Sequence, residues 1–144
     1  MKLYTIGFTK TSAERFFKRL QRAGVKKVVD TRLHRESQLA GFAKQSDLPF
    51  FLSNLAKVEY GVTELLAPTA DILDAYRKKR IKWDEYEKLY GELLSARHVE
   101  AQLTPHDLDH CCLLCSEATP EHCHRRLAAE YLARAWGPIE IIHL

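Results

Sequence analysis

Short apolar runs alternate along this chain with longer stretches in which apolar residues recur every three or four positions. A short run of apolar and β-branched residues is typical of a buried strand, whereas the longer spacing gives a helix one apolar face. The five expected strands cover residues 3–8, 25–29, 58–62, 111–115 and 139–144. Because helical stretches separate them, the pattern predicts an α/β fold, with a mainly parallel sheet of about five strands and helices on both faces.

Local capping signals indicate where the first and last helices begin. Thr11 with Glu14 three residues later has the spacing of a capping box, and Gly24 is placed to end that first helix. Before the last helix, Thr119 offers a hydroxyl to cap free N–H groups, and Pro120 needs no N–H at the first helical position. We therefore expect the last helix to begin at this pair.

Helical spacing also fills the region 69–94, which predicts a helical insertion between the third and fourth strands. An aromatic stripe at this spacing is usually part of a core, and Trp83 and Tyr86 are assigned there. Tyr90 can in addition turn its hydroxyl toward a pocket. The segment 104–107 is expected to be a loop that leads back to the fourth strand.

Length and composition fit one globular domain spanning residues 1–144. Of the 144 residues, 46% are hydrophobic and 28% charged, and a chain of this length can bury a core of its own. No apolar run approaches the roughly 20 residues that span a bilayer, and the chain opens on an expected strand without a signal-peptide layout. We therefore expect a cytoplasmic protein with no membrane partner.

The net charge of +3 is mild. It is compatible with a small anionic ligand, whereas a nucleic-acid-binding protein usually shows a more lopsided balance. The basic run 77–80 falls at the end of an expected helix, where cations complement the helix dipole, so it is explained as a solvated helix end. Neither the strand order nor the oligomeric state follows from these patterns.

Most of the groups capable of chemistry lie between residues 110 and 126. All four cysteines fall in this segment, at Cys111, Cys112, Cys115 and Cys123. A disulfide framework would spread them to staple distant loops, so reduced thiols or a metal are favoured. Taken singly, either cysteine near the site can also be a small buried hydrophobe, which free cysteine usually is.

Helical spacing places two of these groups over the sheet. Cys123 and His124 each lie four residues before an apolar position of the last helix, so both are expected to point inward. They would lie over the strand end that carries Cys115 and Glu117. Arg125 lies about 100° further around the helix and can reach the rim. In open α/β sheets, this edge is where ligands usually bind.

A second polar group follows the second expected strand. Asp30 and Arg32 stand at the carboxyl end of that strand. They are equally well explained as pocket residues or as a structural ion pair that fixes the following loop. If the strands run parallel, this corner and the cysteine corner meet at one edge of the sheet, and the predicted site depends on that convergence.

Several short motifs occur here in the order in which they occur in a known family. They are Thr5-Ile6-Gly7-Phe8, Val29-Asp30-Thr31-Arg32, Leu66-Ala67-Pro68, Trp83-x-x-Tyr86, and Leu114-Cys115-x-Glu117 with Cys123-His124-Arg125. By these motifs the chain resembles domain-of-unknown-function family 488, a group of small uncharacterised α/β proteins, over nearly its whole length. The Cys-x-Glu…Cys-His-Arg element, combined with Asp-x-Arg, is the most specific part. The resemblance implies a fold and a site but no established reaction.

The chain departs from that family at one point after the first strand. Family members often have Gly-His-Ser there, whereas this chain has Gly7-Phe8-Thr9. A role for that histidine is therefore not carried over, although Thr9 can replace the serine hydroxyl.

The first functional hypothesis is a pocket for a small anionic ligand, in an enzyme that acts on a nucleotide-like or other phosphate-bearing molecule. Gly7 and Thr9, at the start of the first helix, would present N–H groups to a phosphate. Arg32 and Arg125 would clamp it. The candidates for general acid or base are Asp30 and Glu117.

The second hypothesis is thiol chemistry, either redox or sulfur transfer. A helix start, His124 and Arg125 would all favour a thiolate at Cys123, and Cys115 would resolve it as a disulfide partner. Asp-x-Arg after a buried strand also resembles sulfurtransferases of the rhodanese type. Their active-site cysteine lies in a loop that runs from strand into helix, whereas Cys123 is expected after the helix has begun, so this hypothesis ranks second.

A zinc site and a binding module are the remaining hypotheses. Cys115, Cys123 and His124 are zinc-type ligands, with His34 or Glu117 as candidate fourth ligands. Zinc is not favoured as a cofactor, because there is no Cys-x-x-Cys pair and sequence neighbours seldom ligate one ion together. A non-enzymatic module for nucleic acid or protein would need a basic stripe or interleaved surface aromatics, which the sequence lacks.

Overall fold

The computed structural model describes residues 1–36 and 40–144, and within them five strands form one parallel sheet. The strand order is β3-β2-β4-β1-β5, so β4 lies in the middle. The strands are β1 (Lys2–Gly7), β2 (Lys27–Asp30), β3 (Glu59–Val62), β4 (Cys111–Cys115) and β5 (Glu140–His143). The predicted α/β class is confirmed, and the predicted bounds of β4 agree with the structure.

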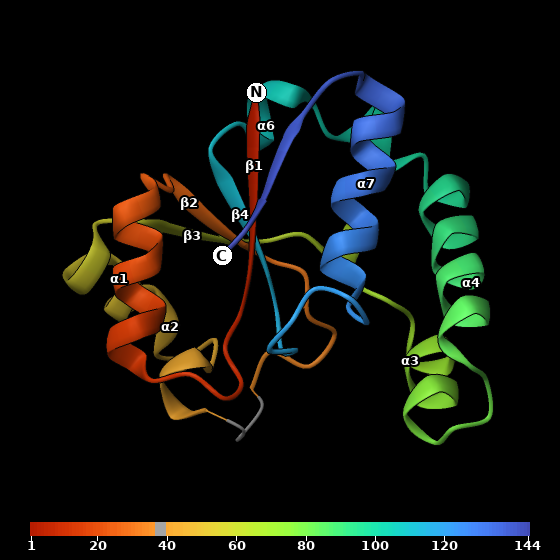
Figure 1. The fold of residues 1–144 in the computed structure, drawn as a ribbon, viewed down its shortest axis with the longest axis horizontal. Helices are drawn as coiled ribbons and strands as arrows, with labels where there is room; N and C mark the ends of the chain where they lie inside the picture. The colour runs from red at the N-terminus through yellow and green to blue at the C-terminus, as the bar shows by residue number, and fades with distance from the viewer. Residues whose placement is uncertain (37–39) are drawn as a thin grey trace.

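Helices cover both faces of the sheet (Figure 1). On one face lie α1 (Ala13–Ala23), α2 (Leu48–Phe51) and the π-helical turn η2 (Leu52–Ala56). On the other lie α3 (Ala70–Arg77), α4 (Trp83–Ala96), α5 (Val99–Gln102), α6 (Pro105–Leu108) and α7 (His124–Trp136). Two short 3-10 turns, η1 (Gly41–Ala43) and η3 (Glu64–Leu66), complete the described elements. The helical insertion between β3 and β4 is therefore present, as α3 to α6.

The alternation of side chains along the strands divides the core into two layers. In β4, Cys112 and Leu114 pack with the α1 side, whereas Cys111 and Leu113 pack with the α7 side. Successive strand residues point to opposite faces, so the next residue, Cys115, follows Leu113 toward α7. The period of the strand thus places Cys115 beneath the start of α7.

Two predictions about local structure are wrong, one at the start of α1 and one at residues 104–107. The side chain of Ser12, not Thr11, caps α1 by accepting a hydrogen bond from the backbone N–H of Arg15. The segment 104–107 is not a loop, because Thr104 and Asp107 form a capping box that opens α6. The spacing of Thr104 and Asp107, with a proline between them, already had the form of a helix start.

The expected start of the last helix is also wrong. α7 begins at His124 with Cys123 as its N-cap, and Thr119 and Pro120 lie in the preceding turns. This segment is held against the strand ends, because Arg125 binds the carbonyl of Glu117 and the sulfur of Cys123 is bonded to that of Cys115. These tertiary contacts override the local capping signal.

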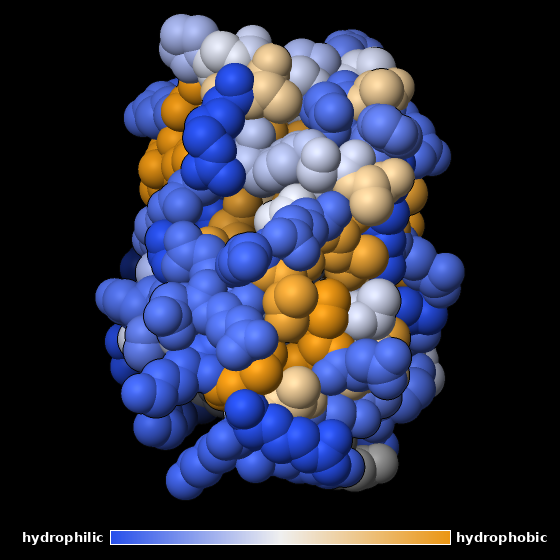
Figure 2. All heavy atoms as spheres, turned by 90° about the vertical axis from the view of Figure 1, so that its right-hand side faces the viewer, coloured by the Kyte–Doolittle hydropathy of each residue, from blue (hydrophilic) through white to orange (hydrophobic). Residues whose placement is uncertain are grey.

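Figure 2 shows the face of the molecule that α3 and α4 cover, on which hydrophilic side chains surround a band of apolar atoms. Among the described residues, no helix combines the length and apolar character needed to cross a membrane.

Candidate functional site at the carboxyl edge of the sheet

A cavity of about 390 Å³ opens where β1, β2 and β4 end. Its wall combines residues from the loops after these three strands, the start of α7, and the insertion helices α3 and α4. They are Thr9, Arg32, Leu33, His34, Pro68, Leu73, Tyr76, Arg77, Trp83, Tyr86, Cys115, Ser116, Glu117, His122, Cys123 and His124. The Arg32 corner and the cysteine corner therefore meet in one place, as the parallel sheet requires.

Asp30 and Arg32 form a buried, two-pronged ion pair. Arg32 donates from Nε to Asp30 Oδ1 at 2.9 Å and from Nη2 to Oδ2 at 2.7 Å, and its backbone N–H also reaches Oδ1. Tyr60 adds a hydroxyl donor to Oδ2 at 2.6 Å. Burial and the contact with Asp30 raise the pKa of Tyr60 above its ordinary value. Asp30 is fully buried and does not line the cavity, so its geometry fits the structural alternative, in which it holds Arg32 in place.

Arg32 itself lies on the cavity wall with one amino group unused. Its guanidinium stands over the ring of Phe8, 5.1 Å from the ring centre, and its side chain is almost entirely buried. Among the described residues, Nη1 has no hydrogen-bond partner. A buried N–H group without an acceptor is costly, so the position favours an acceptor supplied from the cavity.

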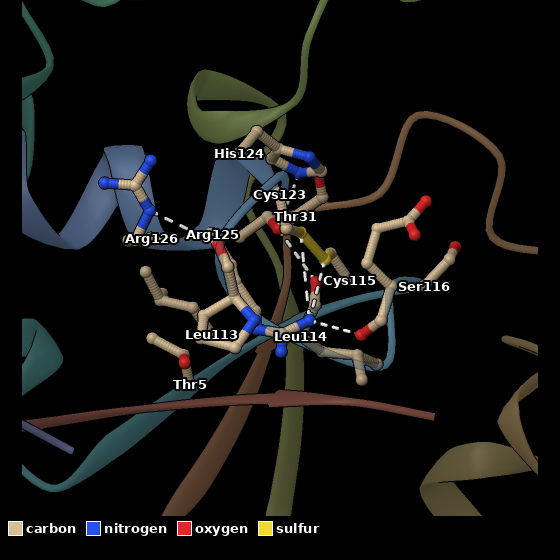
Figure 3. Close-up of a disulfide and its surroundings, with 12 residues drawn as sticks. Thr5, Thr31, Leu113, Leu114, Cys115, Ser116, Cys123, His124, Arg125 and Arg126 are labelled. Atoms are coloured by element: carbon tan, nitrogen blue, oxygen red, sulfur yellow. Dashed lines mark hydrogen bonds between the residues drawn. A yellow bond between two sulfur atoms is a disulfide. The ribbon is translucent and has the colours of Figure 1, made fainter. Parts of the chain in front are cut away.

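The sulfurs of Cys115 and Cys123 are bonded to each other (Figure 3). The preference for reduced thiols or a metal is therefore wrong for this pair, whereas the bond is the one that the thiol hypothesis expects, with Cys115 as the disulfide partner of Cys123. Cys111 and Cys112 are free thiols. The bond links the end of β4 to the N-cap of α7 and lies on the cavity wall. Cys123 precedes α7 and does not lie within it. The expected difference from rhodanese-type sulfurtransferases, whose cysteine lies in a loop between strand and helix, is therefore wrong.

Arg125 does not reach the rim, and this prediction is wrong. Its side chain is fully buried beneath the sulfur pair, with Nη1 donating to the carbonyl of Glu117 and lying 3.2 Å from the sulfur of Cys115. Burial lowers the pKa of Arg125 from 12.5 to about 10, which keeps it charged at neutral pH. Because Arg125 does not line the cavity, it cannot clamp a ligand there together with Arg32.

His124 is held as a neutral imidazole with a fixed tautomer. The hydroxyl of Thr31 donates to the carbonyl of Leu114 at 2.8 Å, so its oxygen accepts from His124 Nε2 at 3.0 Å. The carbonyl of Thr31 accepts from the same nitrogen at 2.9 Å, which places the proton on Nε2. Burial lowers the pKa of His124 from 6.5 to about 4. The lone pair on Nδ1 is then available for a proton or a metal ion.

Gly7 and Thr9, the residues predicted to donate N–H groups to a phosphate, have other roles in the structure. The N–H and the hydroxyl of Thr9 both donate to the carbonyl of Ser116. Gly7 is the last residue of β1, and a Cβ there would lie 1.6 Å from the carbonyl oxygen of Glu117. Gly7 therefore serves close packing of the 116–117 backbone, and helix α1 begins too far along the chain for these two residues to form its N-terminus.

The insertion helices contribute residues that sequence reasoning did not place in the site. The hydroxyl of Tyr90 donates to the carbonyl of Leu66 inside the core, so it does not face the cavity. Tyr86 belongs to the core and Trp83 packs against it, as predicted, and both residues also line the cavity, with their rings stacked at 5.0 Å. Arg77 also lines the cavity. The sequence does not predict this, because the helix dipole alone can explain a basic run at the end of a helix.

Glu117 is exposed at the rim, and its side chain is the only carboxylate among the described residues that line the cavity. Its backbone carbonyl, rather than its carboxylate, binds Arg125. The carboxylate is therefore free to meet a ligand, whereas that of Asp30 is not.

One group of described residues offers metal-ligating atoms close together. Cys115, Cys123 and His124 each present one such atom within 4.8 Å of the others. Zinc binds cysteine as thiolate, and the bonded sulfurs carry none. This group would suit zinc only after the sulfur bond is reduced, and His34 is not part of it.

Fold and site together define a three-layer α/β protein with a cavity at the carboxyl edge of its parallel sheet. The family model described as "Domain of unknown function DUF488" matches residues 12–132. The chain therefore belongs to this family, as its motifs predict. No curated protein and no solved structure matches the chain.

Proposed function

We propose that the cavity binds a small organic anion, phosphate-bearing or nucleotide-like, and that the protein is an enzyme acting on it. The observation that carries the proposal is that Arg32 lines the cavity and that its buried Nη1 has no hydrogen-bond partner among the described residues. A guanidinium held by a carboxylate on one side presents its remaining N–H groups in a fixed direction, which suits recognition of phosphate or carboxylate oxygens.

The charges around the cavity support the same class of ligand. The guanidinium groups of Arg32 and Arg77 line it, against one carboxylate among the described lining residues, that of Glu117. Arg77 is exposed at the end of α3, where its side chain can contact a ligand that enters the cavity. A cavity whose walls carry predominantly positive charge attracts anions and raises their local concentration.

The aromatic wall supports a ligand that also has a flat apolar part. Trp83 is partly buried, stacks on Tyr86, and lies 5.1 Å from the ring of His122. An indole ring that lines the same cavity as two arginines is suited to a base or another aromatic ring next to a charged group. Groups that can do chemistry, Glu117, His124 and the sulfur pair, share this wall, which supports an enzyme over a passive carrier.

Thermal-shift and calorimetric titrations with inorganic phosphate, sulfate and nucleoside monophosphates test this proposal. We expect binding of at least one of these anions to the unaltered protein and a loss of about tenfold or more in affinity for Arg32→Gln. Arg134→Gln, which removes an exposed arginine of α7 outside the cavity, is the matched control and should bind as the unaltered protein does.

Arg32→Gln also leaves the buried carboxylate of Asp30 without its main partner, so Arg77→Gln serves as a second variant that does not disturb the core. We expect a smaller loss of affinity for Arg77→Gln. Trp83→Ala should weaken nucleotide binding more than phosphate binding. The proposal is wrong if no anion binds the unaltered protein, or if Arg32→Gln and Arg77→Gln bind as tightly as Arg134→Gln.

A further inference from the structure

Arg125 is a fully buried cation for which the described residues supply no carboxylate. None of the ion pairs among these residues includes it, although buried Arg32 has a complete partner in Asp30. Nη1 of Arg125 faces the sulfur of Cys115 at 3.2 Å and that of Cys123 at 3.8 Å. Nε and Nη2 have no partner at all among the described residues.

A buried charge without a counter-charge is unfavourable, and proteins retain one when a partner is present in some functional state. The groups nearest to the guanidinium are two sulfurs, and Figure 3 shows Arg125 pointing toward their bond. A disulfide is neutral, whereas a thiolate is an anion. Breaking the bond therefore supplies the counter-charge that Arg125 lacks.

It follows that Arg125 stabilises the reduced form of the pair and not the oxidised form. A disulfide whose reduced state is selectively stabilised is readily reduced, which is the property of catalytic rather than structural disulfides. Both cysteines are buried but line the cavity, so the couple borders the space that a small molecule would enter.

We propose that Cys115 and Cys123 form a redox-active dithiol–disulfide couple that exchanges with low-molecular-weight thiols and disulfides entering the cavity, with Arg125 as the counter-cation of the Cys115 thiolate. The couple goes beyond anion binding and does not depend on it. It adds a chemical activity to the same cavity.

The exchange proceeds in two balanced steps. The thiolate of Cys123 attacks one sulfur of a small disulfide RSSR, the S–S bond of RSSR breaks, and the leaving thiolate takes up a proton to give RSH. The thiolate of Cys115 then attacks the sulfur of Cys123, which forms the Cys115–Cys123 bond and breaks the bond between Cys123 and SR. The leaving RS⁻ takes up a proton from solvent and departs as the second RSH. Two electrons pass from the protein to RSSR, and two RSH molecules reverse the process.

The positions of the two cysteines assign these roles. Cys123 is the N-cap of the thirteen-residue helix α7, where the helix dipole favours a thiolate ready to attack. Cys115 lies nearer to Arg125 and is held at the end of the central strand, which suits the resolving role. Cys112 is an internal comparison, since it is buried and free, and burial raises the pKa of its thiol.

Redox equilibration of the full chain with mixtures of glutathione and glutathione disulfide tests the proposal. The mixtures are quenched with acid, free thiols are alkylated, and the products are counted by mass spectrometry. We expect Cys115 and Cys123 to change state together and reversibly as the ratio changes. Cys112→Ala should behave as the unaltered protein does. A pair that stays oxidised at every ratio, including glutathione alone, is a structural staple and overturns the proposal.

The charge of Arg125 is tested in the same titration. Arg125→Gln should shift the equilibrium toward the disulfide by about tenfold or more, and Arg125→Lys, which keeps a positive charge, should restore most of the original equilibrium. An unchanged equilibrium in Arg125→Gln would contradict the role of Arg125 as counter-cation.

If Arg125→Gln does not fold, the single cysteine variants decide the matter. Cys115→Ser should accumulate a mixed disulfide with glutathione at Cys123, and Cys123→Ser should accumulate about tenfold less at Cys115. Absence of a mixed disulfide in both variants overturns the couple. So does stoichiometric zinc in the reduced protein that shields both cysteines from alkylation. Phosphate binding by these variants, measured separately, tells failure of the couple from failure of the anion site.

Discussion

At the scale of single residues, the site is organised by two buried arginines with different surroundings. Asp30 binds Nε and Nη2 of Arg32, and Nη1 has no hydrogen-bond partner among the described residues. Arg125 has no carboxylate among the described residues and faces sulfur instead. One arginine therefore lines the cavity, and the other faces the protein's own cysteines. The surroundings of each arginine in the fold, and not its sequence motif, determine what its side chain binds.

His124 gives a prediction about acid stability. Its pKa is about 4 in the folded protein and 6.5 in the unfolded chain, so the unfolded chain binds more protons between these values. Stability is therefore complete above about pH 6.5 and is lost as the pH falls toward 4, by about 3 kcal/mol from this residue. Chemical denaturation at pH 7 and pH 4.5 measures the difference.

His124→Gln is the matched control, because its amide keeps an N–H donor but does not titrate. The variant should lose markedly less stability than the unaltered protein between pH 7 and pH 4.5. His143, whose pKa burial also lowers, contributes to the same pH range in both proteins and cancels in the comparison. Equal losses in the two proteins would show that His124 is not held neutral.

At the scale of elements, the sequence predicts strands better than helix ends. The five apolar runs correspond to the five strands, and β4 is bounded as predicted because polar residues flank an uninterrupted apolar run. The start of α7 could not be predicted, since Thr119 and Pro120 are a sound local signal that contacts of Cys123 and Arg125 override. Short-range signals fix an element only where no long-range contact competes.

The same limit explains which site residues the sequence found. The parallel topology alone brings together the residues that lie at strand ends or at the start of α7, namely Arg32, Cys115, Cys123 and His124. Arg125 was misplaced because its burial depends on the space beside Gly7, where any Cβ would collide with a backbone carbonyl. Trp83 packs against the core as predicted, but its place on the cavity wall does not follow from the sequence, because a half-buried aromatic and a core aromatic have the same helical spacing.

Helix α4 offers a prediction about stability at this scale. Gly91 lies in its interior, and a Cβ there would meet no atom within 4 Å. Alanine is a better helix former than glycine, so Gly91→Ala should stabilise the protein by about 0.5–1 kcal/mol. Urea unfolding measures the change. Gly7→Ala is the contrasting variant and should be strongly destabilised, and a destabilised Gly91→Ala would show that the position needs its glycine.

At the scale of the whole molecule, a single sheet connects two separate apolar layers. The α1 layer contains Phe16, whereas both tryptophans, Trp83 and Trp136, pack against the layer of α4 and α7. Because every central strand contributes side chains to both layers, neither layer can be lost while the sheet remains intact. We therefore expect the molecule to unfold as one cooperative unit.

Phe16→Ala tests this coupling from one face to the other. Removing a fully buried phenylalanine should cost about 3–5 kcal/mol. Tryptophan fluorescence reports the opposite layer, and far-UV circular dichroism reports all helices. Both midpoints should fall together and by the same amount. A fluorescence transition that stays in place while the circular dichroism transition moves would show that the layers unfold independently.

The strand order also determines when the polypeptide can acquire its structure during synthesis. β1 precedes the other described strands along the polypeptide, yet its two neighbours are β4 and β5, which begin at residues 111 and 140. During synthesis, one edge of β1 must therefore stay unpaired until β4 has been made, and the other edge until β5 has been made. Such distant pairing slows folding and leaves apolar segments exposed in the meantime, so the nascent polypeptide is expected to depend on chaperones until β5 has emerged.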